Sequence, residues 1–148
     1  MFVAAVACLV LLVVAIVIHY EVLRALSTVL PAVRIAPREK LILVIIGTFF
    51  SHVLQVLLYA LTYLWFTKQL AIGAFKGATE LGFLDSLYFS AETFTSLGFG
   101  DITPVGPLQL VVGSEALIGL LLIGWSASYA FVAMERFWAE EPQGKARR

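Results

Sequence analysis

The sequence predicts an all-α membrane protein with three transmembrane helices and one shorter apolar segment that enters the bilayer without crossing it. Apolar residues make up 61% of the 148 residues and charged residues only 14%, whereas an average soluble domain is about half apolar and about a quarter charged. Three apolar stretches are long enough to cross a hydrocarbon core about 30 Å thick, which takes roughly 20 helical residues. A chain of this length has room for one compact unit.

The first stretch runs from Phe2 to about Ile18. It lacks the positive n-region and the small-residue cleavage site of a signal peptide, so we expect it to remain in the protein. The residues that follow, as far as Pro31, predict a helix at the membrane interface. His19 would anchor the end of the span there; the alternative is a role for His19 in sensing pH or a ligand.

The second stretch runs from Leu41 to Phe66, after a polar break at residues 37–40. Aromatic residues near its end predict a belt at the membrane surface, and they are Tyr59, Tyr63, Trp65 and Phe66. His52 and Gln55 lie three residues apart on one helical face. They predict either hydrogen bonds between helices or a part in gating.

The third stretch runs from about Leu108 to Met134 and is followed by charged and aromatic residues. Between the second and third stretches lies an apolar piece from Leu84 to Phe94. At about eleven residues it is too short to span the bilayer but long enough to dip into it. We therefore expect a re-entrant segment here.

Basic residues predict the orientation, because Lys and Arg collect in cytoplasmic loops. They are concentrated in the first connection and in the C-terminal tail, at Arg24, Arg34, Arg38, Lys40, Arg136, Lys145, Arg147 and Arg148. The segment from Lys68 to Asp85 is balanced in charge, and the extreme N-terminus has no basic residue. We expect a multi-pass protein of the inner (plasma) membrane with its N-terminus outside and its C-terminus in the cytoplasm.

A heptad between the re-entrant segment and the third span places two glycines around an aromatic residue. It reads Thr95-Ser96-Leu97-Gly98-Phe99-Gly100-Asp101. Non-helical backbone at membrane depth is tolerated only where protein surrounds it or water lines it. Glycine readily accepts the positive φ values that turn successive carbonyls to one side. A ring of such carbonyls can replace the hydration shell of a cation.

This heptad resembles the selectivity filter of bacterial-type tetrameric potassium channels. The resemblance extends from about Leu84 to Phe137: residues 88–94 are similar to the pore helix of that family, and residues 101–104 to the turn after its filter. Gly119 lies where the inner helix carries a hinge glycine, if a one-residue gap is allowed. The resemblance implies a re-entrant pore helix and a filter loop in each chain, and a closed homotetramer.

The resemblance also implies the binding residues. Potassium ions would be held at the carbonyls of Ser96, Leu97, Gly98 and Phe99, in a filter that ends at Gly100, with no other cofactor. Ser96 replaces the threonine of the family and Phe99 replaces its tyrosine. These departures leave cation conduction intact.

Three residues are expected to support the filter, namely Glu92, Thr95 and Asp101. By the resemblance, the carboxyl groups of Glu92 and Asp101 lie close together. Two carboxylates in a partly dry site cannot both ionise cheaply, so we expect one to be protonated and hydrogen-bonded to the other. The alternative is that each is separately solvated.

Gating is expected to involve Gly119, Gly124 and Glu115 in the third span. The glycines are either a hinge pair or small residues that allow close helix contact. Glu115 lies one turn nearer the outside than Gly119. It either bonds to the pore helix around Ser90 and Thr93, in a protonated form if required, or faces the cavity and concentrates cations.

The domains implied are an extra N-terminal helix with a basic cytoplasmic connection (1–40), a pore domain (41–138) and a short cytoplasmic tail (139–148). The function implied is passive, potassium-selective conduction by a homotetramer in contact with lipid and monovalent cations. The alternatives are a non-selective monovalent cation channel of the same fold and a non-conducting accessory protein. The formal net charge of zero gives no reason to expect nucleic acid, and no catalytic motif predicts an enzyme. The single cysteine, Cys8, argues against a metal site built on thiolates.

Overall fold

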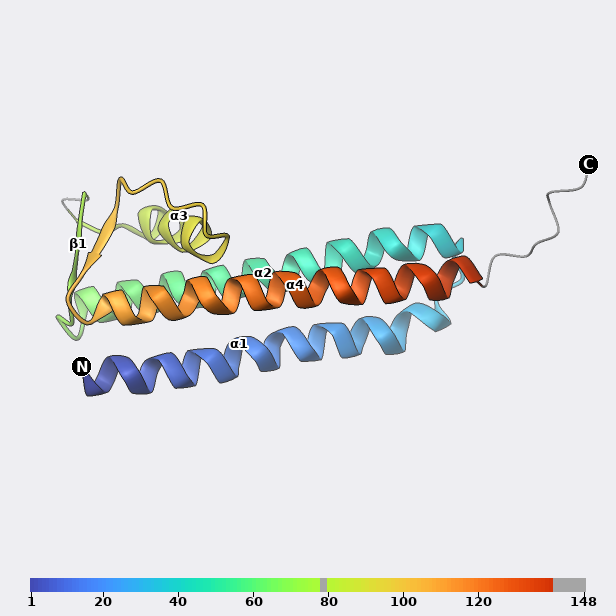
Figure 1. The fold of residues 1–148 in the computed structure, drawn as a ribbon, viewed down its shortest axis with the longest axis horizontal. Coiled ribbons are helices and arrows are strands. Elements are labelled where there is room, and N and C mark those ends of the chain that lie inside the picture. Colours follow the sequence, from blue (N-terminus) through green and yellow to red (C-terminus); the bar gives the residue numbers. More distant parts are fainter. Residues whose placement is uncertain (78–79, 140–148) are drawn as a thin grey trace, which may run out of the picture.

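The computed structural model describes residues 1–77 and 80–139. Three long helices run side by side along the molecule, and a short helix with two short strands lies at one end of this bundle (Figure 1). The long helices are α1 (Phe2–Val29), α2 (Pro37–Lys68) and α4 (Leu108–Ala139). All three are long and apolar enough to cross a membrane. The prediction of an all-α membrane protein with three spans is therefore confirmed.

The first helix is longer than the expected span, and it corrects the interpretation of His19. α1 continues without a break through the expected interface region to Val29. His19 is fully buried within the bundle and does not anchor a helix end at the membrane surface. Its side chain belongs to a buried stripe along α1, made of Ala4, Leu11, Ala15, His19 and Leu23. Steps of four and seven residues keep this stripe on one helical face.

The second helix begins earlier than expected, with Pro37 in its first turn, where the missing N–H costs nothing. The aromatic belt expected near its end is wrong for three of the four residues. Tyr59, Tyr63 and Phe66 are buried, and only Trp65 is largely exposed. Residues 59, 63 and 66 are four and three apart, so they share one helical face and pack into the core.

A short helix, α3 (Phe83–Phe94), forms from the apolar segment between the second and third spans. It begins with a capping arrangement in which Asp85 accepts a hydrogen bond from the backbone N–H of Gly82 at 3.0 Å. α3 packs against both α2 and α4. Figure 1 shows it beside one end of the bundle, where it does not run the length of the long helices.

Two short strands that the sequence did not reveal flank α3. β1 (Ala74–Lys76) pairs antiparallel with β2 (Thr103–Val105), with Lys76 opposite Thr103. The pair joins the segment before α3 to the segment after the heptad. Gly77 lies at the end of β1 with a φ of 97°, and a Cβ there would lie 1.8 Å from the carbonyl oxygen of Asp101. Only glycine allows the two backbone segments to approach this closely.

Apolar packing is divided into two clusters along the bundle. The larger cluster lies near α3 and includes Ala15, Tyr63 and Leu122. The smaller one lies towards the opposite end and consists of Leu30, Val44, Ala133 and Phe137. Between them on each long helix lie polar side chains, which are described below. The expected C-terminal tail lies, from residue 140 onward, outside the described residues.

Candidate functional site

The heptad forms the loop that leaves the C-terminal end of α3, and the sign of its backbone φ alternates. Ser96, Gly98 and Gly100 have φ values of 58°, 57° and 82°, whereas Leu97 and Phe99 are not among the residues with positive φ. This is the alternation expected of a backbone that presents successive carbonyls on one side. Ser96 adopts it despite a cost of roughly 1–2 kcal/mol for a residue with a Cβ.

The two glycines of the loop are required by conformation and not by space. A Cβ built at Gly98 or Gly100 would meet nothing within 4 Å inside the chain. Their positive φ values are nevertheless ones that other residues rarely adopt. A larger residue at either position would therefore disturb the backbone before it disturbed any neighbour in the same chain.

Glu92 on α3 holds the N–H groups of the loop. Its backbone oxygen accepts hydrogen bonds from the N–H of Leu97 at 2.8 Å and, more weakly, from that of Gly98 at 3.4 Å. Its carboxyl oxygen accepts a bond from the N–H of Phe99 at 3.0 Å. Glu92 is itself buried. Three successive N–H groups of the loop are thus directed towards one residue.

The direction of the N–H groups fixes the direction of the carbonyls. In a trans peptide the N–H of one residue points opposite to the C=O of the residue before it, and the described chain has no cis peptide. The carbonyls of Ser96, Leu97 and Gly98 therefore point away from Glu92. The structure thus turns three consecutive carbonyl oxygens of the heptad to the side opposite α3.

Asp101 does not form the expected carboxyl pair. Within the described residues it shares no hydrogen bond with Glu92; it accepts one from the adjacent N–H of Ile102 at 3.0 Å. Glu92 instead bonds to the N–H of Phe99, which gives it a better partner than a second carboxyl group. Both carboxyls act on Tyr88, since partial desolvation and the nearby charges of Asp101 and Glu92 raise the pKa of its phenol.

Thr95 and Phe99 have neighbours within α3. The hydroxyl of Thr95 donates to the carbonyl of Ala91 at 2.8 Å, so it closes the last turn of α3. The ring of Phe99 is stacked on that of Tyr88, with centroids 6.3 Å apart and planes at 3°. Both rings stay partly exposed in the single chain.

Glu115 contacts the short helix and is buried, which decides between its two expected positions. Its carboxyl group forms hydrogen bonds with Tyr63 of α2 and Ser90 of α3. Ser90 also donates to the carbonyl of Val56 at 2.8 Å. A serine has one hydroxyl proton and a backbone carbonyl only accepts. Each of these polar groups has a hydrogen-bond partner when Glu115 is a carboxylic acid that donates to Ser90 and accepts from Tyr63.

Gly119 and Gly124 of α4 have different surroundings. A Cβ at Gly119 would lie 2.1 Å from the carbonyl oxygen of Phe94, so Gly119 allows the end of α3 to lie directly on α4. A Cβ at Gly124 would meet nothing within 4 Å inside the chain. The structure therefore shows close helix contact at Gly119 and no such contact at Gly124.

The polar residues of α2 form the expected bonds between helices. His52 bonds to Ser126 of α4 at 3.0 Å, and Gln55 donates to the carbonyl of Ala15 in α1 at 3.5 Å. Sequence reasoning missed Ser126 and the burial of His19. The spacing of His19 from Ala15, one helical turn, was the available signal.

Comparison with known proteins places this arrangement in a family. Residues 40–136 match a family model described as "Ion channel". The chain belongs to this ion channel family. The matched range begins in the first turn of α2 and ends near the end of α4, so it contains α3 and the heptad and leaves α1 outside.

Individual relatives resemble shorter parts of the chain. It is 35% identical over 81 residues to the inward rectifier potassium channel Kirbac3.1 of Paramagnetospirillum magnetotacticum, a match that covers 53% of this chain and 25% of the relative. It is 45% identical over 38 residues to protein LctB of Bacillus caldotenax, which covers 26% of this chain and 28% of that protein. The chain thus spans about a quarter of the length of these curated relatives. No solved structure gives a significant match.

Proposed function

We propose that the channel conducts potassium ions through a filter built from four copies of the heptad loop. The observation that carries this proposal is the alternating φ of Ser96, Gly98 and Gly100 together with the N–H bonds to Glu92. One loop presents one column of carbonyl oxygens. A ring of oxygens that replaces a hydration shell needs several copies about an axis.

Potassium would bind between successive rings of backbone oxygens from Ser96, Leu97, Gly98 and Phe99, with the Ser96 hydroxyl at the innermost position. The relative named as a potassium channel supports this choice of ion. Glu92 would brace the column from behind, because it binds the N–H groups on the side opposite the oxygens. The oxygens would then keep their spacing without help from other side chains.

The proposed orientation has the N-terminus, β1 and α3 at the outer face of the plasma membrane. The filter loop follows the C-terminal end of α3 and therefore lies part of the way into the membrane. α4 would continue from the filter towards the cytoplasm, where the basic residues of the connection between α1 and α2 also lie. Gly119 and Glu115 would keep α3 fixed on α4 while the lower part of α4 moves during gating.

Reversal potentials in planar bilayers test the proposal. The purified protein is reconstituted with potassium on one side and sodium on the other. We expect the current to reverse close to the potassium equilibrium potential. Reversal near zero would identify a non-selective cation channel of the same fold, and the absence of current under all conditions would indicate a non-conducting accessory protein.

A further inference from the structure

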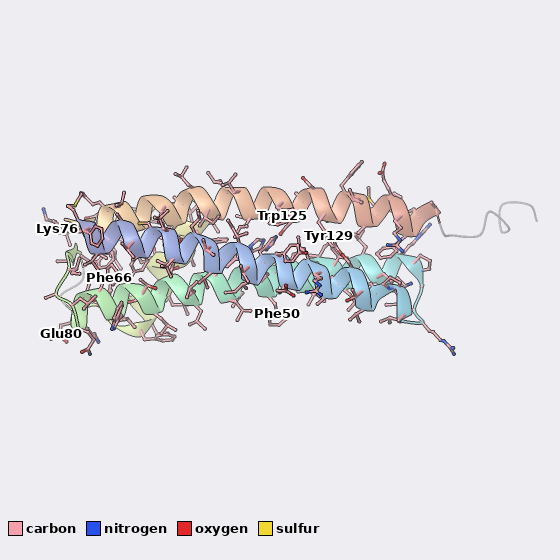
Figure 2. The ribbon with its side chains drawn as sticks, turned by 90° about the horizontal axis from the view of Figure 1, so that it is seen from below. Phe50, Phe66, Lys76, Glu80, Trp125 and Tyr129 are labelled. Carbon is pink, nitrogen blue, oxygen red and sulfur yellow. The ribbon has the colours of Figure 1, made fainter. Side chains whose placement is uncertain are left out.

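A polar cluster crosses the middle of the bundle between the two apolar clusters. It contains side chains from all three long helices: His19 of α1, Ser51, His52 and Gln55 of α2, and Ser126 of α4. His19, Ser51 and Gln55 are fully buried. Figure 2 shows Trp125, the neighbour of Ser126, about midway along the bundle.

The five side chains are connected in a closed sequence of contacts. Gln55 Nε2 lies 3.2 Å from Ser51 Oγ, and Ser51 Oγ lies 3.0 Å from His19 Nδ1. The other nitrogen of His19 lies 3.4 Å from Ser126 Oγ. Ser126 Oγ is 3.0 Å from His52 Nε2, and His52 Nδ1 is 3.3 Å from Gln55 Oε1, which returns to the start.

The carbonyl of Ala15 fixes the direction of these bonds. It can only accept, so the amide nitrogen of Gln55 faces it, at 3.5 Å, and also faces Ser51. The amide oxygen therefore faces His52, whose Nδ1 must carry the hydrogen. Because the Nε2 of a neutral His52 is then an acceptor, the hydroxyl of Ser126 donates to it.

The remaining two bonds follow from the single proton of each hydroxyl. Ser126 has given its proton to His52, so it accepts from His19, whose Nε2 must carry the hydrogen. The Nδ1 of His19 then accepts from the hydroxyl of Ser51, which itself accepts from Gln55. Every group is satisfied by this one assignment, in which both histidines are neutral and have opposite tautomers.

No charged group among the described residues faces the two imidazoles to compensate a proton. The rings of His19 and His52 stack on each other, with centroids 5.3 Å apart. α4 contributes the ring of Trp125 beside His19, and α3 contributes the ring of Phe94 beside His52. On α1, Glu21 and Arg24 are exposed and form an ion pair with each other. On α4, Glu115 is engaged with Tyr63 and Ser90.

We infer that this hydrogen-bonded ring is a pH-sensitive latch: it holds α1 to α2 and α4 beneath the filter while both histidines are neutral, and protonation of either histidine opens it. A proton added to His52 Nε2 or His19 Nδ1 turns that nitrogen from an acceptor into a donor. The hydroxyl of Ser126 or Ser51 must then turn its own hydrogen out of the ring and accept two bonds, so the directed circle of bonds is lost. The new charge also lies against the stacked neighbouring ring, in a site that disfavours unpaired charge.

The latch reaches the filter through Phe94. The ring of Phe94 packs on His52, its carbonyl lies on Gly119, and it precedes the heptad directly. Breaking the hydrogen-bonded ring of the five polar side chains removes this support from the end of α3. Acidification therefore lowers conduction, and this part of the inference rests on the proposed function.

Nitrogen chemical shifts of the histidine side chains test the ring itself, without any need for ion conduction. The chain has two histidines, so a His19→Gln variant assigns both signals in protein reconstituted into phosphatidylcholine vesicles. At neutral pH we expect a neutral His19 with the hydrogen on Nε2 and a neutral His52 with the hydrogen on Nδ1. Identical tautomers for the two histidines, or a charged imidazole at neutral pH, would overturn the inference even if the protein conducts potassium.

Currents recorded at decreasing pH test the coupling to the filter. We expect the wild-type current to fall severalfold on acidification, and the double variant His19→Gln with His52→Gln to lose this response. Ser126→Ala should weaken the response, whereas the matched change Ser128→Ala should not, since the one bond of Ser128 among the described residues goes to the carbonyl of Gly124 in its own helix. An acid response that persists in the double variant would show that the hydrogen-bonded ring does not control conduction. A protein that carries no current at any pH would contradict the proposed function and leave the chemical-shift result to decide on the ring.

Discussion

The buried carboxyl group of Glu92 accepts a hydrogen bond from the backbone N–H of Phe99 at 3.0 Å. The bond spans seven residues and connects α3 to the centre of the heptad loop. A carboxylate is a strong acceptor for a backbone N–H. This side chain therefore helps to set the orientation of the loop, together with the backbone bonds from the N–H groups of Ser96 and Leu97 to the end of α3.

Replacement of Glu92 should destabilise the loop according to the acceptor that remains. Glu92→Ala leaves the N–H of Phe99 without its partner, at a cost of about 1–3 kcal/mol, and we expect a shorter open lifetime in single-channel records. Glu92→Gln keeps an amide oxygen at the same reach and should have a smaller effect. Equal lifetimes for wild type and Glu92→Ala would show that the bond does not hold the filter.

Gly98→Ala should abolish conduction or make it irregular. A Cβ at a φ of 57° costs about 1–2 kcal/mol in each copy of the loop. Potassium flux into vesicles measures the effect. Gly113→Ala is the matched control, since a Cβ there also meets nothing within 4 Å but its φ is not positive. Flux that is unchanged in Gly98→Ala would be incompatible with the filter assignment.

Gly119→Ala should displace α3 from α4, because its Cβ would lie 2.1 Å from the carbonyl oxygen of Phe94. We expect a lower melting temperature of the detergent-solubilised protein and reduced flux. Gly124→Ala, where the chain leaves open space, should keep the wild-type melting temperature. If the two variants have the same melting temperature, the close contact at Gly119 is not required for stability.

Glu115→Gln should be tolerated, whereas Glu115→Ala should not. A glutamine can donate to Ser90 and accept from Tyr63, as the neutral carboxylic acid does. Alanine leaves the buried hydroxyl of Tyr63 without a partner, at a cost of about 1–3 kcal/mol. Thermal unfolding and potassium flux distinguish the variants. A strong loss in Glu115→Gln would show that an ionised carboxylate is needed instead.

A membrane-impermeant thiol reagent should label the two ends of the bundle from opposite sides. Lys76 and Arg34 are both exposed and lie near opposite ends; Figure 2 labels Lys76 at the end that carries β1. In a background without Cys8, Lys76→Cys should react from outside and Arg34→Cys only after permeabilisation. The reverse pattern would contradict the proposed orientation.

Much of the fold could be predicted from hydropathy and from one motif. The spans need only length and apolar composition, and the glycines at 98 and 100 predict the alternating backbone that the structure shows. The two three-residue strands could not be predicted, because so short a run has no periodicity to detect. Their pairing depends on contacts between segments on either side of α3.

Hydropathy also could not separate side chains that face lipid from those that face protein. Tyr59, Tyr63 and Phe66 were assigned to the membrane surface from composition, although their spacing indicates one packed face. His19 was assigned to a helix end because it follows an apolar run. Its burial depends on Ser51 and Ser126, which come from two other helices and cannot be paired with it from sequence alone.

The antiparallel pair of β1 and β2 brings together the two ends of the segment that contains α3 and the heptad. Gly77 lies beside Asp101 and Ile102, so part of the chain entropy that the loop would lose on forming the proposed tetrameric filter is already lost in the single chain. Binding between preorganised surfaces costs less than binding that must first order them. Assembly of the proposed tetramer would therefore use loops that are already shaped in the single chain.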